Sequence, residues 1–216
     1  MISRRPFLLA ALGGISLLVA PLRFAAADTA PIDPAIVFVN RLADTAMQTM
    51  VGKGVPDSER AARFRTLFTT EVDLAEIGRR VLGRYWRSAT PEQQQDFLRL
   101  FEDIVVLTWS TRFKDYGGDL RHTVIGLVDD GERGLTVTSR VERDRQQPIT
   151  LQWRLKRTEG GFRVVDLIVE GSSMAVTYQS EYASVIRANG DRIDGLLSAL
   201  RNKVADLQSS SAAPRN

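Results

Sequence analysis

The fold is decided by a stretch in the second half of the chain that reads Ile149-Thr150-Leu151-Gln152-Trp153-Arg154-Leu155-Lys156. Apolar and polar residues alternate strictly along it, and successive side chains of a β-strand point to opposite faces of its sheet. The apolar members therefore share one face, and the polar members share the other. This period of two predicts a strand with one buried face and one solvated face.

Three more segments show strand composition, and short polar turns separate all four. The predicted strands are Leu120–Val128, Leu135–Val141, Ile149–Leu155 and Phe162–Val169. Short turns join antiparallel neighbours, so the four strands are expected to form a meander. The last strand is apolar on both faces apart from Arg163 and Asp166, which predicts an interior position.

The first half of the chain has a period near 3.6, which is typical of helices. Helices are predicted for Pro34–Met50, from about Asp57, for Leu74–Leu82 and from Thr90 to about Tyr116, and two more, Ala175–Ala188 and Asp191–Leu207, follow the strands. The long helix begins with Thr90-Pro91-Glu92-Gln93, which has the composition of a capping box. Its midsection, Ile104 to Leu107, is apolar on every side and should be covered all round by protein or by a ligand.

These elements predict an α+β fold in which helices wrap a curved four-stranded antiparallel sheet. Such a cone is expected to enclose an apolar cavity. Trp86, Trp109 and Trp153, together with the phenylalanines of the long helix, support a large apolar interior.

The N-terminal segment has the pattern of a secretory signal. Residues 1–27 contain no acid, place Arg4-Arg5 before an apolar run of about 13 residues, and end in small residues at Ala27. A spanning helix needs about 20 apolar residues, so we expect cleavage between Ala27 and Asp28 and no membrane anchor. The arginine pair also resembles the twin-arginine export pattern, and the choice between that route and the general secretory route stays open.

Charge and cysteine content narrow the function classes. The chain has 29 Lys+Arg against 26 Asp+Glu, and three of the arginines leave with the signal, so the mature chain is formally neutral and gives no indication of nucleic-acid binding. The absence of cysteine excludes disulfides and thiolate metal sites, and no metal or other cofactor is expected. Residues 28–208 are predicted to form one domain, followed by a disordered tail at 209–216.

Candidate catalytic groups are few. His122, the single histidine, lies near the start of a predicted strand with no nucleophile pattern beside any serine, and we interpret it as a solvated strand residue. Asp166 and Glu170 are four apart on one strand, which makes a carboxylate pair conceivable, although an arginine partner or a capping role for Asp166 explains it better. No phosphate loop, dinucleotide motif or metal-ligand spacing is present.

Three motifs in order carry a resemblance to a known family. The first runs from Val81-Leu82-Gly83-Arg84-Tyr85-Trp86-Arg87 to Thr90-Pro91-Glu92-Gln93, the second is Gln152-Trp153-Arg154, and the third is Val165-Asp166-Leu167-Ile168-Val169-Glu170-Gly171-Ser172-Ser173-Met174. Together they resemble the MlaC family, also called the toluene-tolerance family, from about Ala35 to Leu207. Ser172 departs from the valine that the family usually has there, which puts a polar group at the expected pocket rim.

The resemblance implies a fold similar to nuclear transport factor 2 and a periplasmic carrier of phospholipid. Its implied partners are an inner-membrane ABC transporter complex with a lipid-binding MCE subunit and an outer-membrane lipoprotein complex, and its implied role is to maintain outer-membrane lipid asymmetry. No nucleic acid is implied, and a monomer is expected. The implied lipid-binding residues are Phe101, Val105, Trp109, Leu151, Trp153, Ile168, Ser172 and Met174.

Other interpretations stay open at this point. A hopanoid or sterol carrier would differ only in the shape of its pocket. An enzyme on the same fold would need Asp166 to be a base that faces the cavity. A purely structural adaptor would show a filled core instead of a cavity.

Overall fold

The computed structural model describes residues 32–50, 55–114, 120–143 and 146–212, and side chains are not described at 49–50, 112–114 and 211–212. The helices are α1 (Pro34–Met50), α2 (Asp57–Glu71), α3 (Leu74–Leu82), α4 (Arg84–Ser88), α5 (Pro91–Lys114), α6 (Met174–Ala188) and α7 (Ile193–Ala212). The strands are β1 (Leu120–Asp129), β2 (Leu135–Arg143), β3 (Gln146–Thr158), β4 (Gly161–Val169) and β5 (Ser172–Ser173). This is the predicted combination of helices and an antiparallel sheet.

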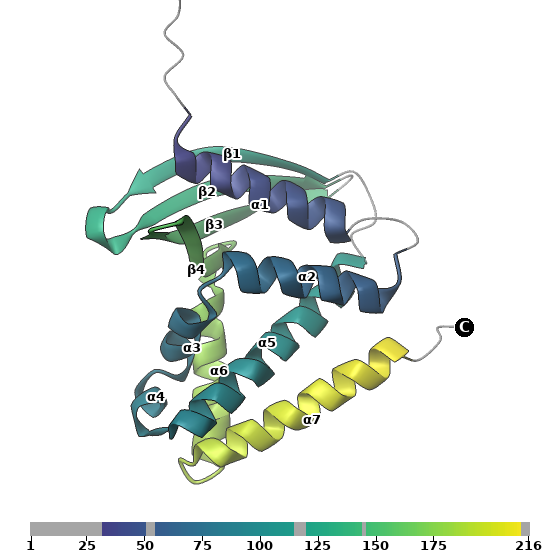
Figure 1. Ribbon diagram of the computed structural model, residues 1–216, viewed down its shortest axis with the longest axis vertical. Coiled ribbons are helices and arrows are strands. Elements are labelled where there is room, and N and C mark those ends of the chain that lie inside the picture. Colours follow the sequence, from purple (N-terminus) through teal and green to yellow (C-terminus); the bar gives the residue numbers. More distant parts are fainter. Residues whose placement is uncertain (1–31, 51–54, 115–119, 144–145, 213–216) are drawn as a thin grey trace, which may run out of the picture. The chain divides into compact units, whose positions relative to one another are not determined.

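The strands form one sheet in the order β1-β2-β3-β4-β5, and each neighbouring pair is antiparallel. The predicted meander is therefore confirmed. One face of the sheet, called the core face below, carries Leu135, Val137, Leu155 and Val164, and α1 covers it with Ala35, Phe38, Val39 and Leu42. Figure 1 shows α1 running along the strands.

The helix starts and ends follow from local chemistry. At the start of α5, the Thr90 N–H donates to the Gln93 side chain and the Gln93 N–H donates to the Thr90 hydroxyl, which completes the predicted capping box. Helix α3 ends at Gly83, whose φ of 55° lies in the region that favours glycine. In the α5 midsection Ile104, Val105 and Val106 are buried, as their unbroken apolarity predicts.

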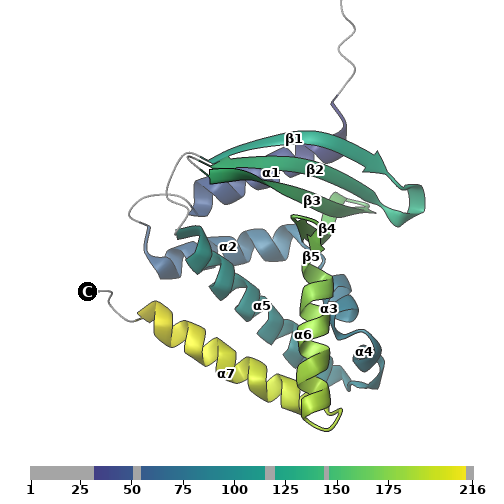
Figure 2. The ribbon, with the colours of Figure 1, turned by 180° about the vertical axis from the view of Figure 1, so that it is seen from behind.

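Buried side chains form two clusters. The sheet cluster consists of α1 and the core face of the sheet, whereas the helix cluster joins α3, α5, α6 and α7 around Phe97, Phe101, Tyr182 and Leu196. Figures 1 and 2 both show α5, α6 and α7 grouped on the side away from β1–β3. Helix α2 touches both clusters, because Leu67 packs against the sheet cluster while Phe64 and Phe68 pack against the helix cluster.

Two elements were not predicted, and one predicted helix end is wrong. Strand β5 adds a fifth strand to the predicted four, because Ser172 and Ser173 pair with the end of β4. Helix α4 was missed because five residues are too few to show a period. Helix α7 continues past Leu207 to Ala212, and its serine hydroxyls at 209 and 210 both donate to the Asp206 carbonyl. Residues 209–212 of the predicted tail are thus helical, and the remainder lies outside the described residues.

Candidate functional site

Helix α5 carries three of the predicted lipid-binding residues on one face. Phe101, Val105 and Trp109 are spaced by four, so they lie in a row. Phe101 is 2% exposed and Val105 is 6% exposed, whereas Trp109 is only partly buried. The row therefore changes from packed core to partly open apolar surface toward the C-terminal end of the helix.

Helix α6 presents a second row, formed by Met174, Tyr178 and Tyr182. The ring of Phe101 meets both tyrosines edge-on, with ring centres 5.2 Å from Tyr178 and 6.2 Å from Tyr182. Met174 is one of the predicted lipid-binding residues, whereas the two tyrosines were not predicted. Because they follow Met174 at spacings of four, helical periodicity could have placed them on the same face.

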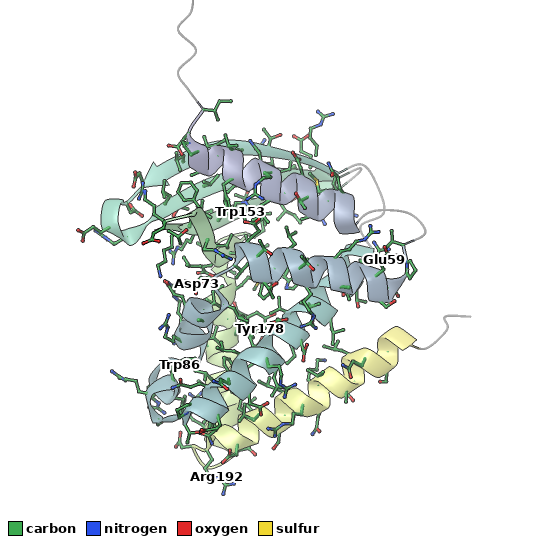
Figure 3. All side chains as sticks on the ribbon, viewed as in Figure 1. Glu59, Asp73, Trp86, Trp153, Tyr178 and Arg192 are labelled. Carbon is green, nitrogen blue, oxygen red and sulfur yellow. The ribbon has the colours of Figure 1, made fainter. Side chains whose placement is uncertain are left out.

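The sheet contributes Leu151 and Trp153. Residues that face each other in an antiparallel pair share a face, and Trp153 pairs with Val137 on β2 and with Leu167 on β4. Both predicted residues therefore lie on the core face, where both are partly exposed. Figure 3 shows Trp153 in the sheet and Tyr178 among the helices. Of the predicted residues, Trp153 packs against the sheet cluster, whereas Phe101, Val105 and Trp109 belong to the helix cluster or pack against it.

Ile168 and Ser172 are not part of either surface. Val164 pairs with Leu155 and Leu167 pairs with Trp153, so β4 has one residue more than β3 between these pairs, and this β-bulge turns Ile168 to the opposite face. Ile168 is buried there, opposite Gln152 on β3. Ser172 in β5 is exposed. The structure thus separates these two residues from Leu151 and Trp153.

Asp166 is 2% exposed on the same face as Ile168. Its carboxylate accepts hydrogen bonds from the Ser173 hydroxyl at 2.6 Å and from the Ala175 N–H at 3.1 Å. Guanidinium nitrogens of Arg154 and Arg80 lie 3.7 and 3.9 Å from it. Asp166 therefore has both of the roles that the sequence favoured, because it pairs with arginines and fixes the start of α6.

The conceivable pairing of Asp166 with Glu170 is not formed. Glu170 lies in the turn after β4 with a φ of 48°, and its carboxylate accepts the Thr150 N–H. The Glu170 N–H in turn donates to the Thr150 carbonyl at 3.0 Å. Glu170 thus extends the pairing between β3 and β4, which is a structural role.

His122 corrects the expectation of a solvated strand residue. It pairs with Val141 and turns toward the ring of Trp153, with ring centres 6.4 Å apart. Among the described residues its buried Nε2 has no hydrogen-bond partner, and burial lowers the imidazole pKa, an effect that Asp44 on α1 partly offsets. A groove of about 560 Å³ between α1 and β1 includes His122, Ile36 and Asn40 in its lining.

Ion pairs to α5 and to α1 hold helix α2 between the two clusters. The Arg65 guanidinium donates to Glu102 and, at 2.6 Å, to Asp103 on α5. At the other end of α2, Arg41 of α1 forms a bidentate pair with Glu71, at 2.9 and 3.2 Å. These contacts fix the helix that touches both clusters.

Several predictions concern other parts of the chain. The predicted cleavage site, Ala27 and Asp28, and the predicted helix end at Tyr116 lie outside the described residues. Within the described ranges no helix is long and apolar enough to span a membrane, and no group of three or more acidic or histidine side chains is placed to hold a metal ion.

The chain is therefore an α+β domain in which the sheet and the helices each present partly covered aromatic side chains. The family model of the MlaC protein matches residues 40–202, so the chain belongs to the MlaC family. It is 24% identical over 135 residues to the toluene tolerance protein ttg2D of Pseudomonas putida, a match that spans 62% of this chain and 62% of that relative.

A solved structure has the same fold. The phospholipid-binding protein of Ralstonia solanacearum, determined in complex with a phospholipid, superposes with a TM-score of 0.71 at 22% sequence identity. The superposition covers 81% of this chain and 98% of that one. The architecture described above is therefore an established one, while the resemblance to nuclear transport factor 2 stays a prediction.

Proposed function

We propose that this protein is a periplasmic phospholipid carrier. The observation that carries the proposal is the pair of partly covered apolar surfaces, with Leu151 and Trp153 on the sheet and Trp109, Met174 and Tyr178 on the helices. Membership of the MlaC family and the phospholipid bound by the Ralstonia protein of the same fold both support it.

The free energy of moving a phospholipid from a membrane into water is large and unfavourable. Burying one methylene stabilises a lipid by about 0.8 kcal/mol, so two acyl chains with roughly 28 methylenes represent on the order of 20 kcal/mol. Free phospholipid therefore hardly enters water. A carrier has to replace the membrane interior with apolar side chains, and it needs no bond chemistry to do so.

The proposed cellular role rests on membership of the MlaC family and on the predicted secretory signal at residues 1–27. Cleavage after Ala27 would release the chain into the periplasm, where the proposed partners are an inner-membrane ABC transporter complex with its MCE subunit and an outer-membrane lipoprotein complex. Shuttling phospholipid between them would maintain outer-membrane lipid asymmetry. Asp166 does not favour the enzyme interpretation, because hydrogen bonds and arginines already engage its carboxylate.

A vesicle assay tests this proposal. Mature protein, residues 28–216, is incubated with donor vesicles that contain fluorescent phospholipid and with unlabelled acceptors. We expect transfer at a rate proportional to protein concentration, with no chemical change in the lipid. A parallel assay with a hopanoid probe separates the lipid classes. Transfer of the hopanoid alone, or conversion of the phospholipid to a product, would contradict the proposal.

A further inference from the structure

Helix α2 lies between the two clusters, yet little of its own apolar surface is buried. Figures 1 and 2 both show it crossing between the sheet and α5. Phe64, Leu67 and Phe68 contact the clusters, and all three are partly exposed. The residues of α2 that are buried, Arg60 and Glu71, are both charged. Apolar burial therefore stabilises the docked position of this helix only weakly.

The C-terminal end of α2 is anchored to the sheet. Val72, which follows the helix, forms a parallel bridge with Val164 on β4, and the Asp73 N–H donates to the Val164 carbonyl at 2.9 Å. The bidentate pair between Glu71 and Arg41 joins the same end to α1. Because backbone hydrogen bonds form part of this attachment, we expect this end of α2 to move only with the sheet.

The middle of α2 is attached in a different way, through the ion pairs of Arg65 with Glu102 and Asp103 on α5, called the Arg65 ion pairs below. The Arg65 side chain is 39% exposed, and the two acidic side chains are 20% and 19% exposed. Ion pairs that water can reach contribute little stability and are screened by salt. Arg99 lies 3.9 Å from Asp103 and remains as its partner when Arg65 leaves. The Arg65 ion pairs can therefore open at a low cost in free energy.

The Arg65 ion pairs are close to the predicted lipid-binding residues of α5. Both acidic partners fall between Phe101 and Val105 along the helix. Phe101 and Val105 are buried, so a lipid reaches them only after part of the protein moves. Moving α2 away from α5 would uncover the helix cluster where Phe64 and Phe68 now pack. Helix α2 is therefore the element whose displacement would give a lipid access to these residues.

We propose that α2 is a lid over the lipid-binding site and that the Arg65 ion pairs hold it closed. This assignment rests on the proposed function. When the ion pairs open, α2 turns about its anchored end near Val72 and uncovers the apolar residues between the sheet cluster and the helix cluster. The ion pairs do not touch the lipid, and they close over the empty and the loaded site alike. Their loss therefore changes the rate of lipid exchange more than the affinity.

The release rate of bound lipid tests the assignment. Mature protein is loaded with a fluorescent phosphatidylethanolamine and mixed with an excess of unlabelled phosphatidylcholine vesicles. Arg65→Gln should release the lipid about fivefold faster than wild type, with the same amount bound at equilibrium. Glu102→Gln removes one of the two ion pairs and should give an intermediate rate. Arg63→Gln is the matched control, because it removes an exposed ion pair with Glu59 inside α2 and should release lipid at the wild-type rate.

Salt and a crosslink test the same point. Raising the salt concentration from about 0.05 M to about 0.5 M screens the ion pairs and should speed release from wild type and from Arg63→Gln, but not from Arg65→Gln. The chain has no cysteine, so Arg65→Cys combined with Asp103→Cys supplies the only two thiols. Joining them with a short bis-maleimide should stop release from preloaded protein, whereas the same variant without the crosslink should release lipid as fast as Arg65→Gln.

The outcomes separate the lid from the proposed function. A wild-type release rate in folded, loaded Arg65→Gln, or undiminished release from crosslinked protein, would overturn the lid alone. If Arg65→Gln does not fold, the rate of Glu102→Gln relative to Arg63→Gln decides in its place. Wild-type protein that takes up no phospholipid would overturn the proposed function and the lid with it.

Discussion

The indole Nε1 of Trp153 on β3 donates a 2.9 Å hydrogen bond to the hydroxyl of Ser139 on β2, whose side chain is completely buried. Trp153 pairs directly with Val137, so the bond runs diagonally to the next residue on the same face. It satisfies the only polar atom of the Trp153 side chain and fixes the ring orientation. The large apolar ring is thus presented on the core face without an unpaired N–H.

Replacing this ring with a charge tests the sheet surface. Trp153→Glu should abolish lipid co-purification, because an ionised carboxylate on the core face repels acyl chains, while a circular dichroism spectrum close to wild type would show that the fold remains. Val176→Glu places the same charge on an apolar residue that is 53% exposed and should leave the lipid content unchanged. If Trp153→Glu keeps the lipid content of wild type, Trp153 is an ordinary core residue and not part of the lipid-binding site.

The helix surface has its own test at Trp109. Trp109→Glu should also eliminate bound lipid, since the predicted site needs both surfaces. Trp109→Phe keeps an apolar ring and should retain most of the lipid. The measurement is the amount of lipid extracted from each variant. Equal amounts in both would show that α5 does not line the lipid-binding site.

Asp166→Asn distinguishes a carrier from an enzyme. The substitution keeps the shape but weakens contacts with Arg154 and Arg80, so the free energy of unfolding should fall by about 2–3 kcal/mol. Lipid transfer by the folded variant should persist. Asp130→Asn, at an exposed turn, is the matched control. A stable Asp166→Asn protein that binds lipid but loses a product-forming activity of wild type would refute the carrier interpretation.

His122 predicts a pH dependence of stability. Burial lowers its pKa below the ordinary value of 6.5, so the unfolded chain binds a proton more readily than the folded protein. The stabilisation from neutral His122 is therefore complete above pH 6.5 and is lost as the pH falls through the folded pKa. Urea unfolding at about pH 8 and about pH 5 should show a larger loss for wild type than for His122→Gln.

A direct titration checks the same point. His122 is the single histidine of the chain, so its imidazole C–H resonances are assigned without ambiguity. Their midpoint in the folded protein should lie below 6.5. A midpoint at or above that value would contradict the burial of this side chain.

Most of the architecture could be predicted from the sequence because periodicity and capping are local. Helix α1 and the capping box at Thr90 have the predicted bounds, and the alternation along β3 places Trp153 on the correct face. Helix α4 depends on tertiary contacts instead. Its Tyr85 bonds to Asp191, a residue far along the chain, and no local pattern records that bond.

The predicted site was harder to define for the same reason. Ile168 belongs to a strand that is apolar on both faces, so the sequence does not show which residues point to the core face. The β-bulge between Val164 and Leu167 sets that choice, and it is visible only in the pairing with β3. Tyr178 and Tyr182 were missed because, in the sequence, tyrosines in a helical row are indistinguishable from ordinary core residues.

Native mass spectrometry of mature protein freshly purified from the periplasm shows whether the protein carries phospholipid. We predict a species whose mass equals that of a chain beginning at Asp28 plus about one phospholipid. Denaturation should release this lipid, and lipid analysis should identify it. Protein that is free of lipid, or that carries only a hopanoid, would contradict the account.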